Sequence, residues 1–301
     1  MFQVIRHDTN YQFTRLMKPA LFLSLALIVL SVGTVVARGG LNFGIDFVGG
    51  TLVELKFKAP VDIAAVRAAL EPPGMGGAEI KHFGSQSEVL ITTEQSSTSV
   101  EGIEKIVRGG LDGRWDGQYE VQRLEMVGPK VGADLRSKAL WSLIASWALM
   151  LAYITWRFEF KFAVGGILAL VHDVIIAVGI FTLLGRTFSL TVLAAVLTIV
   201  GFSINDTIVI YDRIRELLRR ESKRSFREII DLAVNQTLSR SILTSLTVFF
   251  VLLVLFVFGG EIISDFSLIL LIGVVVGSYS TIFIAAPIIM VWEGKGIRLR
   301  K

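Results

Sequence analysis

Long apolar runs separated by short polar segments make up most of the chain. Six of these runs have the length of a transmembrane helix, since about 20 helical residues cross roughly 30 Å of hydrocarbon. They lie at 19–37, 138–156, 162–184, 188–211, 240–258 and 266–292. The first run follows Arg15 and Lys18, as a signal peptide would, but it is long for that role and no clear cleavage motif precedes Arg38. We therefore predict six uncleaved transmembrane helices.

The polar stretch between the first two runs, 38–136, has a different pattern. Its segment 51–58, TLVELKFK, alternates apolar and polar side chains, which is typical of a strand with one buried face. Asp62 is placed to cap a following helix and Pro72 to end it, and glycines end a second helix. Further strands are predicted at 78–83, 87–94 and 118–128, and the two helices at 61–72 and 97–110. The order β-α-β-β-α-β predicts a ferredoxin-like domain.

The segment before the fifth run has a helical pattern of its own. Residues 225–241 place an apolar set on one face of a helix. The set is Phe226, Ile229, Ile230, Ala233, Val234, Thr237 and Leu238. We expect this helix to lie at the membrane surface and to continue into the fifth span, which places Arg240 on a helix entering the bilayer.

These patterns divide the chain into three parts. Residues 1–37 form a short N-terminal segment and the first span, 38–136 form the α+β domain, and 137–301 hold the other five spans with a basic loop at 212–239. Of the 301 residues, 53% are hydrophobic. The fold class is an α-helical integral membrane protein with six spans and one small ferredoxin-like domain between the first two.

Lysine and arginine predict the orientation of the spans, because cytoplasmic loops carry an excess of both. With a cytoplasmic N-terminus, basic residues near the spans fall almost entirely on the cytoplasmic side, and the short outer loops hold only Arg186. Both termini are then cytoplasmic and 38–136 lies outside. This asymmetry explains the pI of about 9.4, so we do not expect a nucleic-acid partner. The run 213–227 sets the topology, and contact with anionic lipid is an alternative role.

Enzyme signatures are missing from the sequence. The three histidines are far apart, and no HExxH, GxSxG, P-loop or complete GxGxxG motif occurs. Tyr211–Asp212 resembles half of an intramembrane aspartyl protease site, but the GxGD partner motif is absent. The chain contains no cysteine, which excludes a disulfide framework and a thiolate metal site. We expect no catalytic residues, no metal and no cofactor.

Ionisable and polar side chains nevertheless lie within the predicted spans. His172 and Asp173 lie near the middle of the third span, Asn205 and Asp206 in the later half of the fourth, and Arg240 at the start of the fifth. A charge at the centre of a spanning helix costs about 2.5–3.5 kcal/mol, and such groups usually face the bundle interior with a partner. We interpret the five residues as a proton or ion pathway.

Each of these groups also has a structural interpretation. Asp206 and Arg240 would make a structural ion pair, which is compatible with proton carrying because a nearby cation keeps the carboxylate ionised. Arg240 would alternatively extend to the membrane boundary, as long basic side chains do. His172 and Asp173 would form a packing hydrogen bond between helices.

Several other positions are assigned packing or surface roles. Gly273 and Gly277 form a GxxxG pattern on the sixth span, which allows close helix contact. Pro287 is expected to kink that span. Asp212 and Arg213 lie at the membrane boundary, where a solvated ion pair is the expected role.

Six segments, in order and at matching positions in the topology, resemble the SecF family, the smaller membrane subunit of the bacterial SecD–SecF export complex. The first carries Asp46, Gly49 and Gly50, and the fourth carries Asp212 and Arg213. The segments are FGIDFVGGTLVEL (43–55), VGPKVGADL (127–135), HDV (172–174), SINDTIVIYDRIRE (203–216), VNQTLSRSILTS (234–245) and DFSLILLIGVVVGSYSTIFIAAP (265–287).

The resemblance implies one half of an RND-superfamily assembly in the bacterial inner membrane, with six spans pairing with those of SecD and a periplasmic ferredoxin-like domain. It implies association with the SecYEG channel and use of the proton motive force to complete translocation of secretory preproteins. The family's essential Asp on span four and Arg on span five fall on Asp206 and Arg240. Protonation of Asp206 would weaken its attraction to Arg240 and let the two bundles repack.

Two rival functions remain open from the sequence. One is a passive scaffold for SecD, in which the buried charges only hold helices together. The other is a stand-alone RND-type exporter of small molecules, which would need a partner or a homodimer because this chain carries one six-span half and one small external domain.

Overall fold

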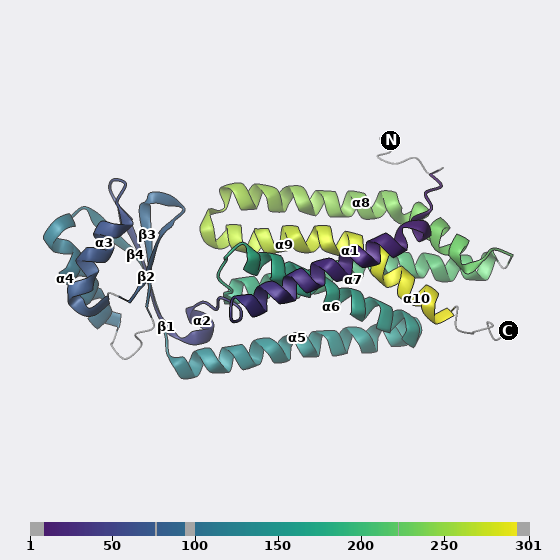
Figure 1. Cartoon of the computed structure of the whole chain (residues 1–301), viewed down its shortest axis with the longest axis horizontal. Helices are drawn as coiled ribbons and strands as arrows, with labels where there is room; N and C mark the ends of the chain where they lie inside the picture. The colour runs from purple at the N-terminus through teal and green to yellow at the C-terminus, as the bar shows by residue number, and fades with distance from the viewer. Residues whose placement is uncertain (1–8, 76, 94–99, 222, 294–301) are drawn as a thin grey trace. The chain divides into compact units, whose positions relative to one another are not determined.

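A computed structural model describes residues 9–75, 77–93, 100–221 and 223–293 (Figure 1). The chain forms two compact units. The smaller unit comprises Asn42–Trp141 with Thr187–Leu190, and the larger unit comprises the rest of the chain.

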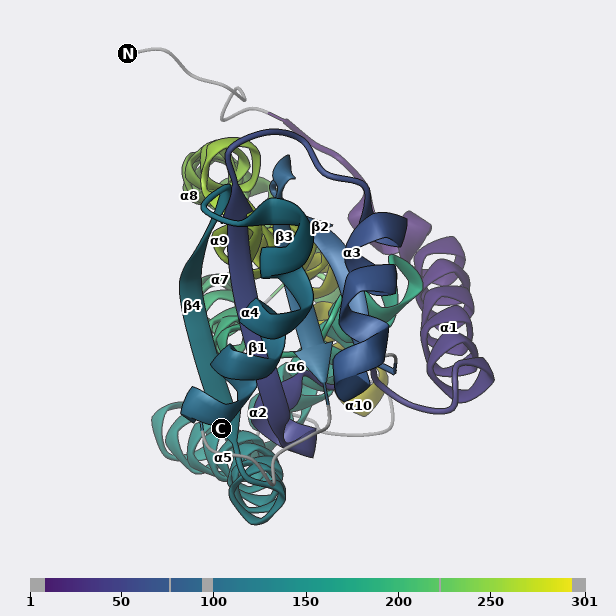
Figure 2. The same cartoon turned by 90° about the vertical axis from the view of Figure 1, so that its left-hand side faces the viewer.

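The smaller unit is built on one antiparallel sheet of four strands in the order β2-β3-β1-β4. The strands are β1 (Gly50–Phe57), β2 (Glu79–Phe83), β3 (Ser85–Thr93) and β4 (Tyr119–Val127). Two helices, α3 (Ile63–Leu70) and α4 (Val100–Trp115), cover one face of the sheet (Figure 2). A short helix, α2 (Ile45–Val48), precedes β1. The chain order β1-α3-β2-β3-α4-β4 confirms the predicted ferredoxin-like arrangement.

The core of this unit follows from the apolar alternation of its strands. Val53, Leu55 and Phe57 of β1 are buried, whereas the intervening Lys56 is exposed, because successive side chains of a strand point to opposite faces. Asp62 caps α3, and its carboxylate accepts a hydrogen bond of 3.1 Å from the Ala64 backbone N–H. The α-helix ends at Leu70 and passes into a π-helical turn, Glu71–Met75, that contains Pro72. The buried strand face and the two helices thus make one apolar core.

One predicted boundary in this unit is wrong. The glycines at 109–110 were expected to end the second helix, but α4 continues past them. Ile103, Val107 and Leu111 recur every four residues and are fully buried, so packing outweighs the cost of glycine in a helix, about 1 kcal/mol each. The chain turns only at Gly117, whose φ of +65° is in the left-handed region that glycine adopts readily.

The larger unit is a bundle of long apolar helices. Among the described residues, six helical spans are long and apolar enough to cross a membrane, as predicted. They are α1 (Phe13–Ala37), α5 (Pro129–Arg157), α6 (Phe160–Leu183), α7 (Leu190–Arg220), α8 (Phe226–Phe258) and a last span made of α9 (Gly260–Ser280), a π-helical turn (Thr281–Ala285) and α10 (Ala286–Glu293).

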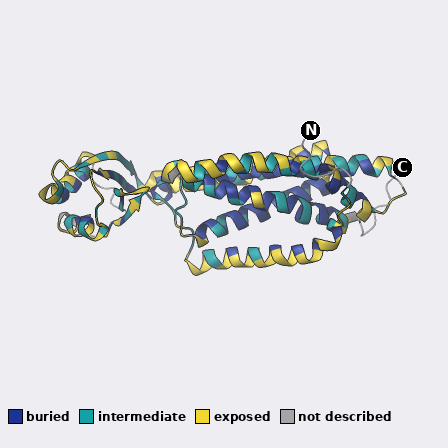
Figure 3. Ribbon diagram, turned by 90° about the horizontal axis from the view of Figure 1, so that it is seen from above, coloured by how far each residue is buried: buried dark blue, intermediate teal, exposed yellow. Residues whose placement is uncertain are grey.

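The spans differ greatly in how much of their surface is buried. In the apolar 18-residue stretch of α6, 61% of the residues are buried, whereas the share is 6% in the corresponding stretches of α5 and α8. Figure 3 shows the buried residues gathered in the interior of the bundle and the exposed ones on its outer helices. The outer faces of α5 and α8 are therefore apolar surfaces open to lipid or to another membrane chain.

The segment predicted as a basic loop, 212–239, is helical over most of its length. The α7 helix continues to Arg220 and α8 begins at Phe226. Ser225 starts α8 with a capping box: its hydroxyl accepts from the Glu228 N–H, and the Glu228 carboxylate accepts from the Ser225 N–H. The amphipathic segment predicted at 225–241 is thus the first part of α8, and Arg240 lies within a continuous helix.

Candidate functional site

A buried carboxylate lies on the fourth span. Asp206 of α7 is only 5% exposed. The Ser245 hydroxyl of α8 donates to its Oδ2 atom over 3.4 Å, and Ser245 Oγ is 2.8 Å from Ser278 Oγ of α9. Ser278 in turn donates to the Val274 carbonyl. Asp206 therefore sits at the end of a chain of hydroxyl groups contributed by two neighbouring helices.

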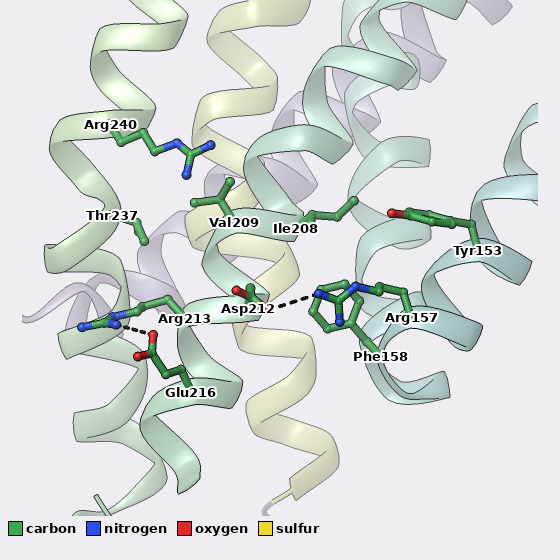
Figure 4. A pocket seen from close by; sticks show the side chains of 10 residues that line it. All are labelled: Tyr153, Arg157, Phe158, Ile208, Val209, Asp212, Arg213, Glu216, Thr237 and Arg240. Atoms are coloured by element: carbon green, nitrogen blue, oxygen red, sulfur yellow. Dashed lines mark hydrogen bonds and ion pairs between the residues drawn. The ribbon is translucent and has the colours of Figure 1, made fainter. Parts of the chain in front are cut away.

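Arg240, the predicted partner of Asp206, lies on α8. Figure 4 shows its side chain reaching from α8 toward Val209 of α7. The residue is exposed. Among the described residues, its guanidinium makes no hydrogen bond and no ion pair. It therefore does not form the expected ion pair with Asp206. The structure thus shows the two charges on neighbouring helices without direct pairing.

Asn205 is placed differently from its neighbour. It is exposed, whereas Asp206 is buried, because consecutive residues of a helix lie about 100° apart around its axis. The structure does not bring Asn205 to the hydroxyl groups that surround Asp206.

A second polar cluster surrounds Asp173 of α6, which is fully buried. Its Oδ2 accepts hydrogen bonds from Ser203 Oγ of α7 at 2.6 Å and from Ser280 Oγ at the end of α9 at 2.8 Å. Its Oδ1 lies 2.9 Å from Nδ1 of His172. Three helices therefore meet at this one carboxylate.

The ring of His172 connects the cluster to the first span. It stacks on Tyr279, with ring centroids 6.3 Å apart, and the Tyr279 hydroxyl donates to the Ala20 carbonyl of α1. Tyr279 also lies 3.0 Å from Ser24 Oγ. The Nε2 atom of His172 is buried, with no hydrogen-bond partner among the described residues.

The predicted glycines lie where α9 approaches α7. A Cβ atom on Gly273 would lie 2.3 Å from Ile199 Cγ1, and one on Gly277 would lie 3.1 Å from Ser203 Cβ. Gly277 therefore leaves the room in which Ser203 reaches Asp173. The same helix becomes irregular just before Pro287, whose ring nitrogen has no hydrogen to donate to the carbonyl four residues earlier.

Asp46, Gly49 and Gly50 lie in the closely packed segment that leads from α2 into β1 of the smaller unit. Gly49 and Gly50 have φ of +83° and +138°, and a Cβ on Gly50 would lie 2.4 Å from the Thr93 carbonyl oxygen. Asp46 Oδ2 accepts a hydrogen bond from the backbone N–H of Leu190, the first residue of α7. This motif shapes the backbone and caps a helix start.

Asp212 and Arg213 lie side by side in sequence but do not contact each other. Adjacent residues on a helix do not face one another, and each side chain finds a partner elsewhere. Asp212 lies 4.0 Å from Arg157 of α5, while Arg213 contacts Glu216 and donates to Gln236 of α8. All except Gln236 line a cavity of about 380 Å³ that also includes Arg240 (Figure 4).

The sequence pattern did not indicate the hydroxyl residues of these clusters. Ser203 and Ser280 contact Asp173, and Ser245 contacts Asp206. Ser278 contacts Ser245, and Tyr279 contacts the ring of His172. Serine gives a weak signal in an apolar span because its hydroxyl also bonds to its own helix, as Ser278 does to Val274. The described residues contain no group of three or more His, Asp or Glu side chains placed to hold a metal ion.

The fold and these clusters are those of a multi-pass helical membrane protein that buries ionisable groups inside its bundle. Two family models match the chain. The model described as Protein export membrane protein SecD/SecF, C-terminal, matches residues 112–295, and the SecD/SecF GG motif matches residues 36–61.

Curated relatives and solved structures agree with these matches. The protein translocase subunit SecF of Desulfurispirillum indicum is 44% identical over 95% of this chain and 92% of its own length. The SecF of Magnetococcus marinus is 44% identical over 97% of this chain and 94% of its own length. This chain therefore belongs to the SecF family, as its motifs indicated.

A crystal structure of SecDF, described as a translocon-associated membrane protein from Thermus thermophilus, matches 97% of this chain with a TM-score of 0.84 and 35% identity. A second SecDF structure, in a super-membrane-facing form, matches with a TM-score of 0.72. This chain spans 40% of the length of each SecDF chain. The match covers both the helical bundle and the small sheet domain.

Proposed function

We propose that this chain couples the proton motive force to protein export, as the SecF subunit of a translocase in the bacterial inner membrane. In this proposal it pairs with SecD, works beside the SecYEG channel on secretory preproteins, and has no hydrolytic site of its own. Family membership and the match to SecDF support the role. The orientation with both termini in the cytoplasm is supported by the placement of basic residues.

The observation that carries the proposal is the environment of Asp206. A carboxylate buried in a membrane span marks an ion or proton pathway. The Ser245 hydroxyl lies 3.4 Å from Oδ2 of Asp206. A hydroxyl both donates and accepts, so Ser245 donates to the carboxylate and accepts from the carboxylic acid. The site therefore accommodates both protonation states of Asp206.

Arg240 supplies the second element of the proposed mechanism. Its guanidinium lies on the adjacent helix without a described partner, and it attracts Asp206 only when that carboxylate is ionised. Proton binding at Asp206 removes the attraction and changes the contact of α7 with α8. A charge crossing 100 mV releases about 2.3 kcal/mol, which biases two helix arrangements by tens of fold.

Partner binding follows from the apolar faces of α5 and α8. Only 6% of the apolar 18-residue stretch of each helix is buried. Both helices therefore have an exposed apolar face against which a second bundle can pack in the membrane. Packing of such faces in membranes depends on close helix contact. In the proposed complex SecD contributes that second bundle.

Infrared difference spectroscopy of the membrane-embedded complex, between high and low pH, tests whether Asp206 binds a proton. We expect a protonated carboxyl signal that is lost in Asp206→Asn and retained in Asp173→Asn. Asp173 is the matched control because it is buried in the same bundle but held by three close partners. A signal unchanged in Asp206→Asn would favour the passive scaffold.

A further inference from the structure

Two serine hydroxyls lie between the buried Asp206 and the last span. Ser245 Oγ of α8 is 3.4 Å from Asp206 Oδ2 and 2.8 Å from Ser278 Oγ of α9. Ser278 Oγ is also 2.8 Å from the carbonyl oxygen of Val274, one turn earlier on its own helix. These four oxygen atoms, all in the larger unit, form a hydroxyl row that runs from a carboxylate on α7 to a backbone carbonyl on α9.

The number of hydrogens in the hydroxyl row limits how its hydrogen bonds are arranged. Each serine hydroxyl has one hydrogen to donate, and its oxygen also accepts. The Val274 carbonyl has no hydrogen, and Asp206 has one only in its protonated form. While Asp206 is ionised, two hydrogens therefore serve three oxygen–oxygen links. A proton on Asp206 supplies the third.

The two forms of Asp206 therefore require opposite directions of donation. When Asp206 is ionised it only accepts, so Ser245 donates to it and Ser278 donates to Ser245. When Asp206 is protonated it donates to Ser245, Ser245 donates to Ser278, and Ser278 donates to the Val274 carbonyl. A hydrogen lies between the two serine oxygens in both forms, as their 2.8 Å separation requires.

The end of the hydroxyl row on α9 makes this reversal inexpensive. A carbonyl within an α-helix accepts from the N–H four residues later and has two lone pairs. The Val274 carbonyl therefore keeps a hydrogen bond when the Ser278 hydroxyl turns away from it. Arg240 and Thr244 also interact with Asp206, but both belong to α8. The link to α9 runs through Ser245.

We propose that Ser245 and Ser278 are positioning residues for proton binding at Asp206, whose hydroxyls reverse direction with each binding event and keep α8 bonded to α9 throughout. The Ser245–Ser278 hydrogen bond is present in both forms, whereas Ser245 changes from donor to acceptor toward Asp206. Proton binding therefore alters the contact of α7 with α8 and leaves the contact of α8 with α9 intact. This inference rests on the proposed function, because it requires Asp206 to bind a proton.

Infrared difference spectroscopy of the membrane-embedded complex tests the hydroxyl row through the C=O stretching band of protonated Asp206. Hydrogen bonds in a chain strengthen one another. Ser278→Ala removes the acceptor of the Ser245 hydrogen, so the bond from Asp206 to Ser245 weakens and we expect the band to shift to higher frequency. Ser245→Ala removes that bond altogether and should shift the band further. Ser278→Thr keeps a hydroxyl and should leave the band in place.

The matched control is Thr182→Val, which removes a hydroxyl that is buried in the same bundle and donates to the Val178 carbonyl of its own helix. We expect no shift of the Asp206 band in this variant. A band that stays in place in Ser278→Ala, or that shifts equally in Thr182→Val, would overturn the hydroxyl row and leave the proposed function standing. Absence of any carboxyl band that depends on Asp206 would overturn the proposed function and this inference together.

Discussion

Asp206 and Asp173 are both buried carboxylates in the bundle, but their surroundings differ. Asp173 receives close contacts from His172, Ser203 and Ser280. Asp206 is 3.4 Å from the Ser245 hydroxyl and also interacts with Thr244 and Arg240 of the same helix, α8. The contacts of Asp173 come from three helices. In our account Asp173 therefore joins helices, and Asp206 is the proposed proton carrier.

This difference predicts unequal effects on stability. Asp173→Ala leaves two serine hydroxyls and a histidine nitrogen without their partner, so we expect the free energy of unfolding to fall by about 3 kcal/mol. Asp206→Ala loses one 3.4 Å hydrogen bond, and we expect a loss below about 1 kcal/mol. Thermal unfolding of the purified complex measures both. Equal destabilisation would remove the distinction between the two carboxylates.

At the scale of helices, the close approach of α9 to α7 holds Ser203 in reach of Asp173. The approach depends on Gly273 and Gly277, where an added side chain would meet Ile199 or Ser203. The irregular turn Thr281–Ala285 follows directly, and π-helical turns of this kind are frequent at functional sites. The last span is thus shaped around the polar cluster.

Glycine substitution tests this contact. We expect Gly273→Ala to destabilise the bundle by about 1–3 kcal/mol, because its Cβ would lie 2.3 Å from Ile199 Cγ1 and overpacks the interface. Gly201→Ala on α7 is the matched control, since a Cβ there meets nothing within 4 Å. The control should be neutral or slightly stabilising, as alanine favours a helix. Tolerance of both substitutions would show that the contact is loose.

Much of this architecture was predictable because long apolar runs and strand alternation are local patterns. The six spans, the order of strands and helices, and the capping role of Asp62 follow from such patterns. The error at 109–110 arose because burial of Leu111 outweighs local glycine propensity, a tertiary effect. The hydroxyl partners of Asp173 were missed for the same reason, since Ser203 and Ser280 meet it only once three helices pack.

At the scale of the whole molecule, the boundary between the two units falls within two helices. Both α5 and α7 begin in the smaller unit and continue in the larger one. The N–H of Leu190, at the start of α7, is held by Asp46 in the smaller unit. Asp206 lies on the part of α7 that belongs to the larger unit.

The central claim is that proton binding at Asp206 drives export. The most direct measurement is the completion of preprotein translocation in membrane vesicles with and without a proton gradient, in the unchanged chain, Asp206→Asn and Asp134→Asn at equal abundance. Asp134 is an exposed carboxylate on α5 and serves as the control. We predict that only Asp206→Asn abolishes stimulation by the gradient while the complex stays assembled. Full stimulation in Asp206→Asn would contradict the account.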